Sequence, residues 1–323
     1  MPHLQQWLGR SLAMPLAVAA IAAVPTAPAT ATPGSGRAVV VTMGDSYISG
    51  TAGRWNGNST SLTGSYDGTD RACGTDLATC ALRDEAKVYI EGTNVDFCER
   101  SDVSEVLSAH IPGLAPINLA CGGATTPNLL PTSLGGRSWK GEQPQGDALA
   151  QVARTSDVRA IVITIGGNDL RLATAVSNCG VGYINATGPC RDAIKPGLDA
   201  SQGDGLAKVM TAAQGIRSVM RAAGYDDNDY RLIVQSYESP IPRAKEIRYR
   251  ENGPERERHG CPYYDVDADY IRDVAIPQIN ATLKTAAHRT GAEFIDLTNF
   301  MQGREVCSKS AHAVTPQTPP SAA

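Results

Sequence analysis

The stretch Ala38-Val39-Val40-Val41-Thr42-Met43-Gly44-Asp45-Ser46-Tyr47 joins an apolar run to a polar glycine turn. A continuous apolar run favours a strand that is buried on both faces of a parallel sheet. A glycine turn after such a strand delivers the next side chains to the carboxyl edge of the sheet, where open α/β sheets bind ligands. A serine at that edge is a candidate nucleophile if a base and oxyanion donors meet it. Alone, the Gly-Asp-Ser turn is a weak signal, because these residues more often form an ordinary turn.

Apolar runs of this kind recur along the chain, with helical patterns between them. We predict buried parallel strands over Val39–Met43, Pro116–Ala120, Ala160–Ile165, Leu232–Gln235 and Glu293–Leu297. The clearest helical patterns cover Gly205–Ala223 and Asp267–Arg289, and Pro277 is expected to kink or break the second. Alternating strands and helices imply right-handed crossovers and predict an α/β fold: a three-layer α/β/α sandwich around a five-stranded parallel sheet.

The first 31 residues are predicted to be a signal peptide. Arg10 precedes an apolar stretch, Ser11 to Val24, and Ala29-Thr30-Ala31 forms a small-residue cleavage site. A retained membrane anchor is the alternative, but the stretch is too short to span a bilayer. We therefore expect a secreted protein, with a globular domain over residues 32–314 and a Pro/Ala-rich tail over residues 315–323.

The composition argues against several kinds of partner and cofactor. The formal net charge is −4 and no basic stripe occurs, which excludes nucleic acid and anionic membranes as expected partners.

Eight cysteines in an exported chain indicate disulfides, and the C-x₂-C units of a zinc site are missing, so we expect no metal. Their count alone leaves 105 connectivities open. The charged run from Arg248 to His259 is expected to be a solvated loop or short helix.

Two more predicted strands end in glycines, and the third strand also ends in an amide. The second strand runs into Cys121-Gly122-Gly123-Ala124, and the third into Gly166-Gly167-Asn168-Asp169. Acyl transfer needs N–H donors aimed at the oxyanion that forms on the attacked carbonyl. A backbone N–H at glycine and an asparagine side chain are typical suppliers, because neither adds charge.

These three turns, in this order, resemble the blocks of the SGNH family, the GDSL-type lipases and esterases. The likeness runs over most of residues 37–307 and includes Cys98-Glu-Arg-Ser101 and Asp296-Leu-Thr-Asn299. It implies a flavodoxin-like SGNH hydrolase fold without a cofactor, in which the five strands lie in the order 2-1-3-4-5. Ser46 would be the nucleophile, and the N–H groups of Ser46 and Gly123 with the Asn168 side chain would form the oxyanion hole. Asp45 and Asp169 are expected to brace loops. No G-x-S-x-G elbow of the larger α/β-hydrolases surrounds the serine.

The resemblance also implies how the cysteines pair. Secreted members of the family join the cysteine ahead of the second block to the one inside it, here Cys98 and Cys121. The remaining pairs are then expected in sequence order: Cys73–Cys80, Cys179–Cys190 and Cys261–Cys307. The first of these lies in a long stretch rich in glycine, serine and threonine, and is the pair for which the family gives the least guidance.

The family's fourth block, Asp-x-x-His, has no counterpart in this sequence. Five histidines occur, at positions 3, 110, 259, 288 and 312, and none follows an acid by three residues. His110 and His288 lie near predicted helix ends and are expected to be structural. His312 is the one late histidine and the remaining candidate base. We expect the polypeptide to be C-terminally truncated ahead of the histidine block and to be weakly active or inactive.

Three functions are compatible with these residues. The leading interpretation is a secreted serine ester hydrolase (a lipase, esterase or acylhydrolase) that acts on small-molecule or lipid acyl esters as a monomer without a stable membrane anchor. A second is a catalytically silent module that keeps the pocket but lacks the base. A third is a carbohydrate deacetylase or a phospholipase A-type enzyme, because all of these share the same blocks.

Overall fold

The computed structural model describes residues 32–51, 53, 89–90, 93 and 98–311, and all of them belong to one compact unit. At its centre lies a parallel sheet of five strands in the order β2-β1-β3-β4-β5, as the sequence predicts. The strands are β1 (Ala38–Gly44), β2 (Ala115–Asn118), β3 (Asp157–Thr164), β4 (Arg231–Gln235) and β5 (Glu293–Ile295).

Two strands end two residues earlier at their carboxyl ends than the apolar pattern predicts. The second was expected to reach Ala120 but ends at Asn118, because the Gly44 N–H, which would continue the ladder, donates to the Gln145 side chain (2.8 Å). The fifth was expected to reach Leu297 but ends at Ile295. There the hydroxyl of Ser236 accepts the Leu297 N–H (2.6 Å), so a side chain replaces the next ladder bond.

Helices cover the two faces of this sheet. The α-helices are α1 (Ser46–Ser49), α2 (Glu105–Ser108), α3 (Thr126–Leu129), α4 (Gln145–Thr155), α5 (Leu172–Ile184), α6 (Arg191–Ala222), α7 (Pro254–Arg258), α8 (Asp265–Tyr270) and α9 (Ile276–Arg289). Short 3₁₀ turns, η4 (Thr132–Leu134) and η5 (Ala244–Glu246), and a π-helical turn, η6 (Ile271–Ala275), complete the described part.

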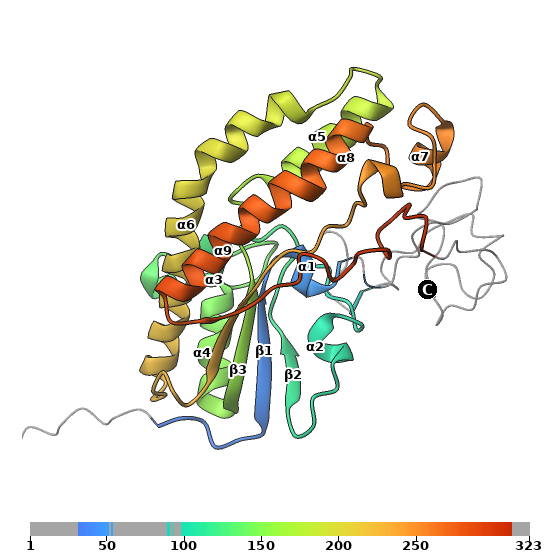
Figure 1. The fold of residues 1–323 in the computed structure, drawn as a ribbon. Coiled ribbons are helices and arrows are strands. Elements are labelled where there is room, and N and C mark those ends of the chain that lie inside the picture. Colours follow the sequence, from blue (N-terminus) through green and yellow to red (C-terminus); the bar gives the residue numbers. More distant parts are fainter. Residues whose placement is uncertain (1–31, 52, 54–88, 91–92, 94–97, 312–323) are drawn as a thin grey trace, which may run out of the picture. The chain divides into compact units, whose positions relative to one another are not determined.

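Neighbouring side chains along β4 point to opposite faces of the sheet and show which helices cover each face. Val234 is fully buried in the main core, against the face covered by α3, α4, α6 and α9. Its neighbour Gln235 points to the opposite face, where its amide donates to the carboxylate of Glu105 on α2 (2.7 Å). Figure 1 shows α3, α4, α6 and α9 on one side of the sheet and α2 on the other. The predicted three-layer α/β/α arrangement is therefore correct.

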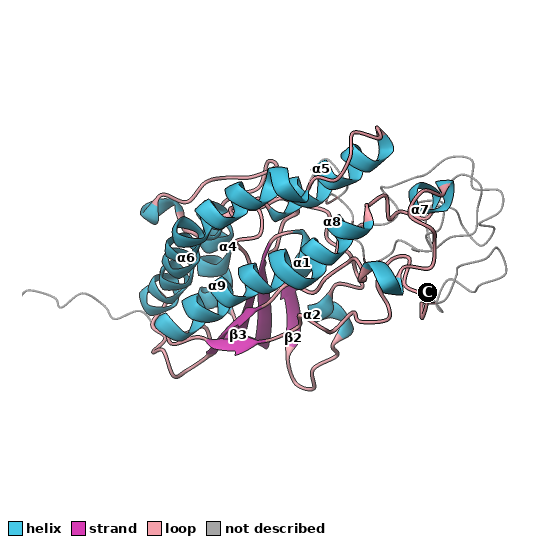
Figure 2. Cartoon of the chain, turned by 45° about the horizontal axis from the view of Figure 1, so that its top comes forward, coloured by secondary structure: helices cyan, strands magenta, loops and turns pink. Residues whose placement is uncertain are grey.

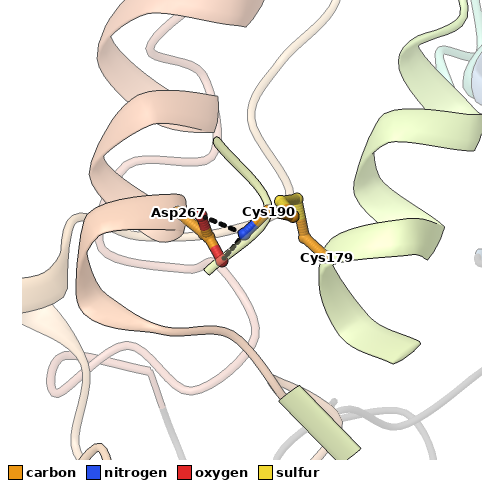
Figure 3. Close-up of side chains that lie close together, drawn as sticks. All are labelled: Cys179, Cys190 and Asp267. Carbon is orange, nitrogen blue, oxygen red and sulfur yellow. Dashed lines mark hydrogen bonds between the residues drawn. A yellow bond between two sulfur atoms is a disulfide. The ribbon is translucent and has the colours of Figure 1, made fainter. Parts of the chain in front are cut away.

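Helix α6 begins 14 residues earlier than the periodicity predicts, at Arg191 instead of Gly205. Its first turns carry Pro196 and several glycines, which are poor helix formers. The tertiary structure compensates at the N-terminus, where the carboxylate of Asp267 accepts the N–H groups of Cys190 (3.0 Å) and Arg191 (2.9 Å), as Figure 3 shows for Cys190. A carboxylate at this end satisfies orphan donors and meets the positive end of the helix dipole.

Pro277 interrupts the predicted helix of residues 267–289 without ending it. The chain stays helical from α8 through the π-helical turn η6 into α9, where Pro277 occupies the first turn. In η6 the N–H of Ile276 bonds to the carbonyl of Ile271, five residues back. This wider turn ends directly before the proline, whose ring clashes with a carbonyl four residues earlier in a regular α-helix.

The charged run of residues 248–259 is less solvated than the sequence suggests. It holds the short helix α7, as one of the two expected forms, but Arg256 within it is only 2% exposed. The Arg256 guanidinium donates to the carbonyls of Tyr249 (3.1 Å) and Tyr263 (2.6 Å) and pairs with Asp265 (2.5 Å). A buried arginine is tolerated because its donors are satisfied in this way.

Three disulfides join cysteines in the pairs that the family resemblance implies. They are Cys98–Cys121, Cys179–Cys190 and Cys261–Cys307. Cys73 and Cys80 lie outside the described residues, as do the expected signal peptide and the Pro/Ala-rich tail. Within the described ranges, no helix has the length and apolar character needed to cross a bilayer.

Candidate active site

The turn after β1 is fixed through the backbone of Gly44. Gly44 adopts φ +140°, and a Cβ at this position would lie 2.0 Å from the carbonyl oxygen of Thr164, so only glycine fits. The buried side chain of Gln145, at the start of α4, accepts the Gly44 N–H (2.8 Å) and donates to the Gly44 carbonyl (2.9 Å). Ser46 follows as the first residue of α1, with its side chain partly exposed.

Asp45 links this turn to two other strand ends. Its carboxylate accepts the Tyr47 N–H (3.1 Å), which caps α1, and the hydroxyl of Tyr237 (2.6 Å). The same Tyr237 hydroxyl accepts the N–H of Gly167 (2.8 Å), beyond the end of β3. Complete burial raises the pKa of Asp45 to about 7, although the hydrogen bonds from Tyr237 and Tyr47 oppose the shift. These contacts give Asp45 the bracing role expected for it.

The three glycine turns meet at one edge of the sheet. Because the strands are parallel and β1 lies between β2 and β3, their carboxyl ends are neighbours. The Asp45 N–H donates to the carbonyl of Thr164 (3.1 Å), and the Cys121 N–H donates to that of Gly44 (3.0 Å). The Asn168 side chain donates to the carbonyl of Ala124 (2.8 Å), which ties the third turn to the second.

A second acid fixes the same pair of turns. The Asp169 carboxylate accepts both the N–H and the hydroxyl of Thr126, each at 2.9 Å, at the start of α3. Asp169 therefore joins the turn after β3 to the helix that follows the turn after β2. This is again a bracing contact, as the sequence predicts.

Three N–H donors at this edge have no acceptor among the residues described. They are the backbone N–H groups of Ser46 and Gly123 and the second amide hydrogen of Asn168, whose Nδ2 donates its first hydrogen to the carbonyl of Ala124. Gly123 is exposed, and Ser46 and Asn168 are partly so, so a ligand can reach all three. Neutral donors gathered at one edge are suited to stabilising a developing oxyanion.

The described histidines do not gather at this edge. His110 lies between α2 and the start of β2, and His288 is in the last turn of α9, shortly before β5. Both therefore precede the amino ends of strands, at the edge opposite Ser46. His259 follows α7 and stacks on Tyr249 (ring centroids 4.4 Å apart, interplanar angle 12°). Helix α7 lies away from α1 in both Figure 1 and Figure 2. His312 is outside the described residues.

A cluster of Cys179, Cys190 and Asp267 has the spacing of a metal site, with ligand atoms within 4.8 Å of one another. Figure 3 shows why its chemistry is different. The two sulfur atoms form a disulfide, so they offer no thiolate, and Asp267 is used to cap α6. The donor set does not fit a metal ion.

Sequence reasoning missed two residues that shape this edge. Tyr237 lies two residues after the end of β4, so its position after a predicted strand was a usable signal. Gln145 gave no such signal, because it reaches Gly44 across a sequence separation of 101 residues. Its role depends on how α4 packs on the sheet, where it contacts β3.

Residues 89–313 match the model of the GDSL-like lipase/acylhydrolase family; the Gly44-Asp45-Ser46 turn lies ahead of the matched range. No curated protein matches the chain.

Several solved structures are similar at low identity. An extracellular lipase from Streptomyces rimosus is 20% identical with a TM-score of 0.43, covering 88% of this chain and 97% of that one. A phospholipase A1 from Streptomyces albidoflavus NA297 is 17% identical with a TM-score of 0.43, covering 86% of each chain. A lipase from a goat rumen metagenome is 14% identical with a TM-score of 0.37, covering 88% and 93%. At these values they say nothing about the substrate of this chain.

The family match spans well over half of the sequence, and the five-stranded parallel sheet has the strand order that the family resemblance implies. The chain belongs to the GDSL-like lipase/acylhydrolase family and is an SGNH-type ester hydrolase by family.

Proposed function

We propose that this protein is a secreted serine ester hydrolase that works through an acyl-serine intermediate. Ser46 is the nucleophile, and the oxyanion is held by the N–H groups of Ser46 and Gly123 and by the Asn168 side chain. The observation that carries the proposal is the direct hydrogen bonding of the three turns, which gathers these donors at one edge of the sheet.

The reaction follows from this arrangement in two steps. The Ser46 hydroxyl oxygen attacks the acyl carbonyl carbon and loses its proton to a base, while the carbonyl oxygen becomes an oxyanion. Collapse of this intermediate breaks the ester C–O bond, and the alcohol leaves with a proton. Water then attacks the acyl-serine in the same way and releases the carboxylic acid. His312 is the candidate base, because His110 and His288 lie at the opposite edge.

Secretion is supported by two features. Three disulfides occur in the described residues, which is usual for proteins of oxidising compartments and rare in the cytosol. The first 31 residues have the pattern of a signal peptide. The substrate class we propose is a small or lipid acyl ester. A carbohydrate acetyl ester and a phospholipid are narrower alternatives that the same chemistry serves.

The test combines covalent labelling with turnover. A fluorophosphonate probe should label Ser46, identified by peptide mass spectrometry, and p-nitrophenyl esters of increasing chain length should be hydrolysed. Ser46→Ala should abolish both signals. Ser177→Ala, an exposed serine on α5, is the matched control and should change neither. Labelling or turnover that survives in Ser46→Ala would place the chemistry elsewhere.

A second candidate function is a catalytically silent module that binds esters without hydrolysing them. It is favoured by the placement of His110 and His288 away from Ser46. In serine hydrolases that lack the base, the oxyanion donors and substrate binding alone still accelerate the reaction by roughly 10³–10⁴-fold over the uncatalysed reaction in water. His312→Ala separates the two candidates. Loss of turnover identifies His312 as the base, and unchanged, near-background turnover supports the silent module.

A further inference from the structure

We propose that Trp139 is a positioning residue that fixes the direction of the Gly123 N–H, the second donor of the oxyanion hole. The inference rests on the proposed function of this edge and extends it to a residue outside the three family blocks. It concerns the peptide bond between Gly122 and Gly123. Neither residue has a side chain that could restrict the rotation of this peptide.

The geometry of that peptide carries the argument. The indole Nε1–H of Trp139 donates to the carbonyl oxygen of Gly122 (2.9 Å). Among the described residues all peptide bonds are trans, so this carbonyl and the Gly123 N–H lie in one plane and point in opposite directions. A bond that fixes the carbonyl therefore fixes the N–H on the other side of the peptide.

Gly123 needs this restraint because its backbone is permissive. It adopts φ +79° at an exposed position, where glycine loses little by rotating to other conformations. The indole ring also packs against it, since a Cβ on Gly123 would lie 3.3 Å from the nearest ring carbon. Trp139 is nevertheless 41% exposed, so the ring forms a surface beside the donor.

Trp139 is itself held in place by a tight hairpin. Its backbone exchanges two hydrogen bonds with Glu142 (3.1 and 2.9 Å) across Lys140 and Gly141, both with positive φ. The Glu142 carboxylate is paired at both oxygens with the Arg100 guanidinium (2.8 and 2.6 Å). This fork geometry fixes both partners.

The same arginine reaches the glycine turn. Arg100 donates through Nε to the carbonyl of Ala120 (2.8 Å), and Cys98, two residues earlier, is joined to Cys121 by a disulfide. The Gly122 N–H donates to the carbonyl of Cys98 (2.9 Å). The hairpin and the oxyanion turn are thus anchored to one segment, which keeps the Trp139 side chain in register with the peptide it orients.

The experiment separates the indole N–H from the ring. Trp139→Phe keeps an aromatic ring against Gly123 but removes the donor, and Trp139→Ala removes both. We expect Trp139→Phe to lower kcat for a p-nitrophenyl ester by about 3–10-fold, as for loss of one neutral hydrogen bond, with KM unchanged. That is less than the roughly 10²–10³-fold for loss of a direct oxyanion donor. Leu134→Ala, an exposed apolar side chain on η4, is the control and should leave kcat unchanged.

Two further measurements keep the inference testable if turnover is low. An alkyl boronic acid forms a tetrahedral adduct with the serine, so its affinity should fall by the same factor in Trp139→Phe. The amide nitrogen shift of Gly123 should also move in this variant, since it reports the bond to the preceding carbonyl.

The outcomes distinguish the two proposals. If Ser46→Ala leaves turnover and boronate binding unchanged, the proposed function fails. If both depend on Ser46 but Trp139→Phe matches the parent protein in kcat, boronate affinity and the Gly123 shift, the role of Trp139 is refuted. A change in KM alone would make Trp139 a binding surface and would also overturn the positioning role.

Discussion

Replacing Gln145 by leucine should destabilise the protein through the backbone of a single glycine. In the folded state the Gly44 N–H has the Gln145 Oε1 as its acceptor (2.8 Å), and both groups are buried. Leucine leaves this N–H unpaired, which costs about 1–3 kcal/mol. The Gly44 carbonyl also loses one donor but keeps the Cys121 N–H (3.0 Å), so its loss is about 0.5–1 kcal/mol.

The two losses together predict a decrease of about 1.5–4 kcal/mol in the free energy of unfolding. Urea unfolding followed by circular dichroism measures this decrease. If the free energy of unfolding falls by about 3 kcal/mol per molar urea, the urea concentration at the midpoint should fall by about 1 M. Gln151→Leu is the matched control, because it makes the same substitution at an exposed position of the same helix. It should change stability by less than about 0.5 kcal/mol.

The Gln145→Leu substitution should also lower activity. The turn that Gln145 clamps presents Ser46, so Ser46-dependent labelling should slow in Gln145→Leu while it stays unchanged in Gln151→Leu. If Gln145→Leu is as stable as Gln151→Leu and labels at the parent rate, water replaces the side chain and the clamp has no energetic role.

Three further predictions concern the same edge. Asn168→Ala should lower Ser46-dependent turnover by about 10²–10³-fold with little change in KM, measured with a p-nitrophenyl ester, and an unchanged kcat would remove Asn168 from the oxyanion hole. Because burial raises the pKa of Asp45 from 3.8 to about 7, the folded protein holds this proton more tightly than the unfolded chain, and its stability should fall as pH rises from about 4 to 7. Urea unfolding across that range should show a smaller slope in Asp45→Asn, and an equal slope would mean that other groups dominate. Replacing Cys98 and Cys121 together by alanine opens a loop with a sequence separation of 23, which should cost about 3 kcal/mol and which thermal unfolding would detect.

The amino-acid sequence by itself determined the fold class and the five strands, and its resemblance to a known family implied their order. Continuous apolar runs such as Val39–Met43 mark buried parallel strands whatever surrounds them, because both faces of each strand must be covered. The same logic placed Ser46, Gly123 and Asn168 at one edge, since each follows a strand end closely. These are local signals, and local signals can be read from a sequence.

The tertiary structure alone decided what holds that edge in shape. Gln145, Trp139 and Tyr237 reach their partners from distant parts of the chain, and α6 extends to Arg191 because Asp267 caps it from another helix. Each of these contacts depends on the packing of whole elements, which sets distances that no spacing of residues encodes. Hydrogen bonds between remote segments form only after the core has placed both partners, so the positions of the donors came from the sequence and their directions from the fold.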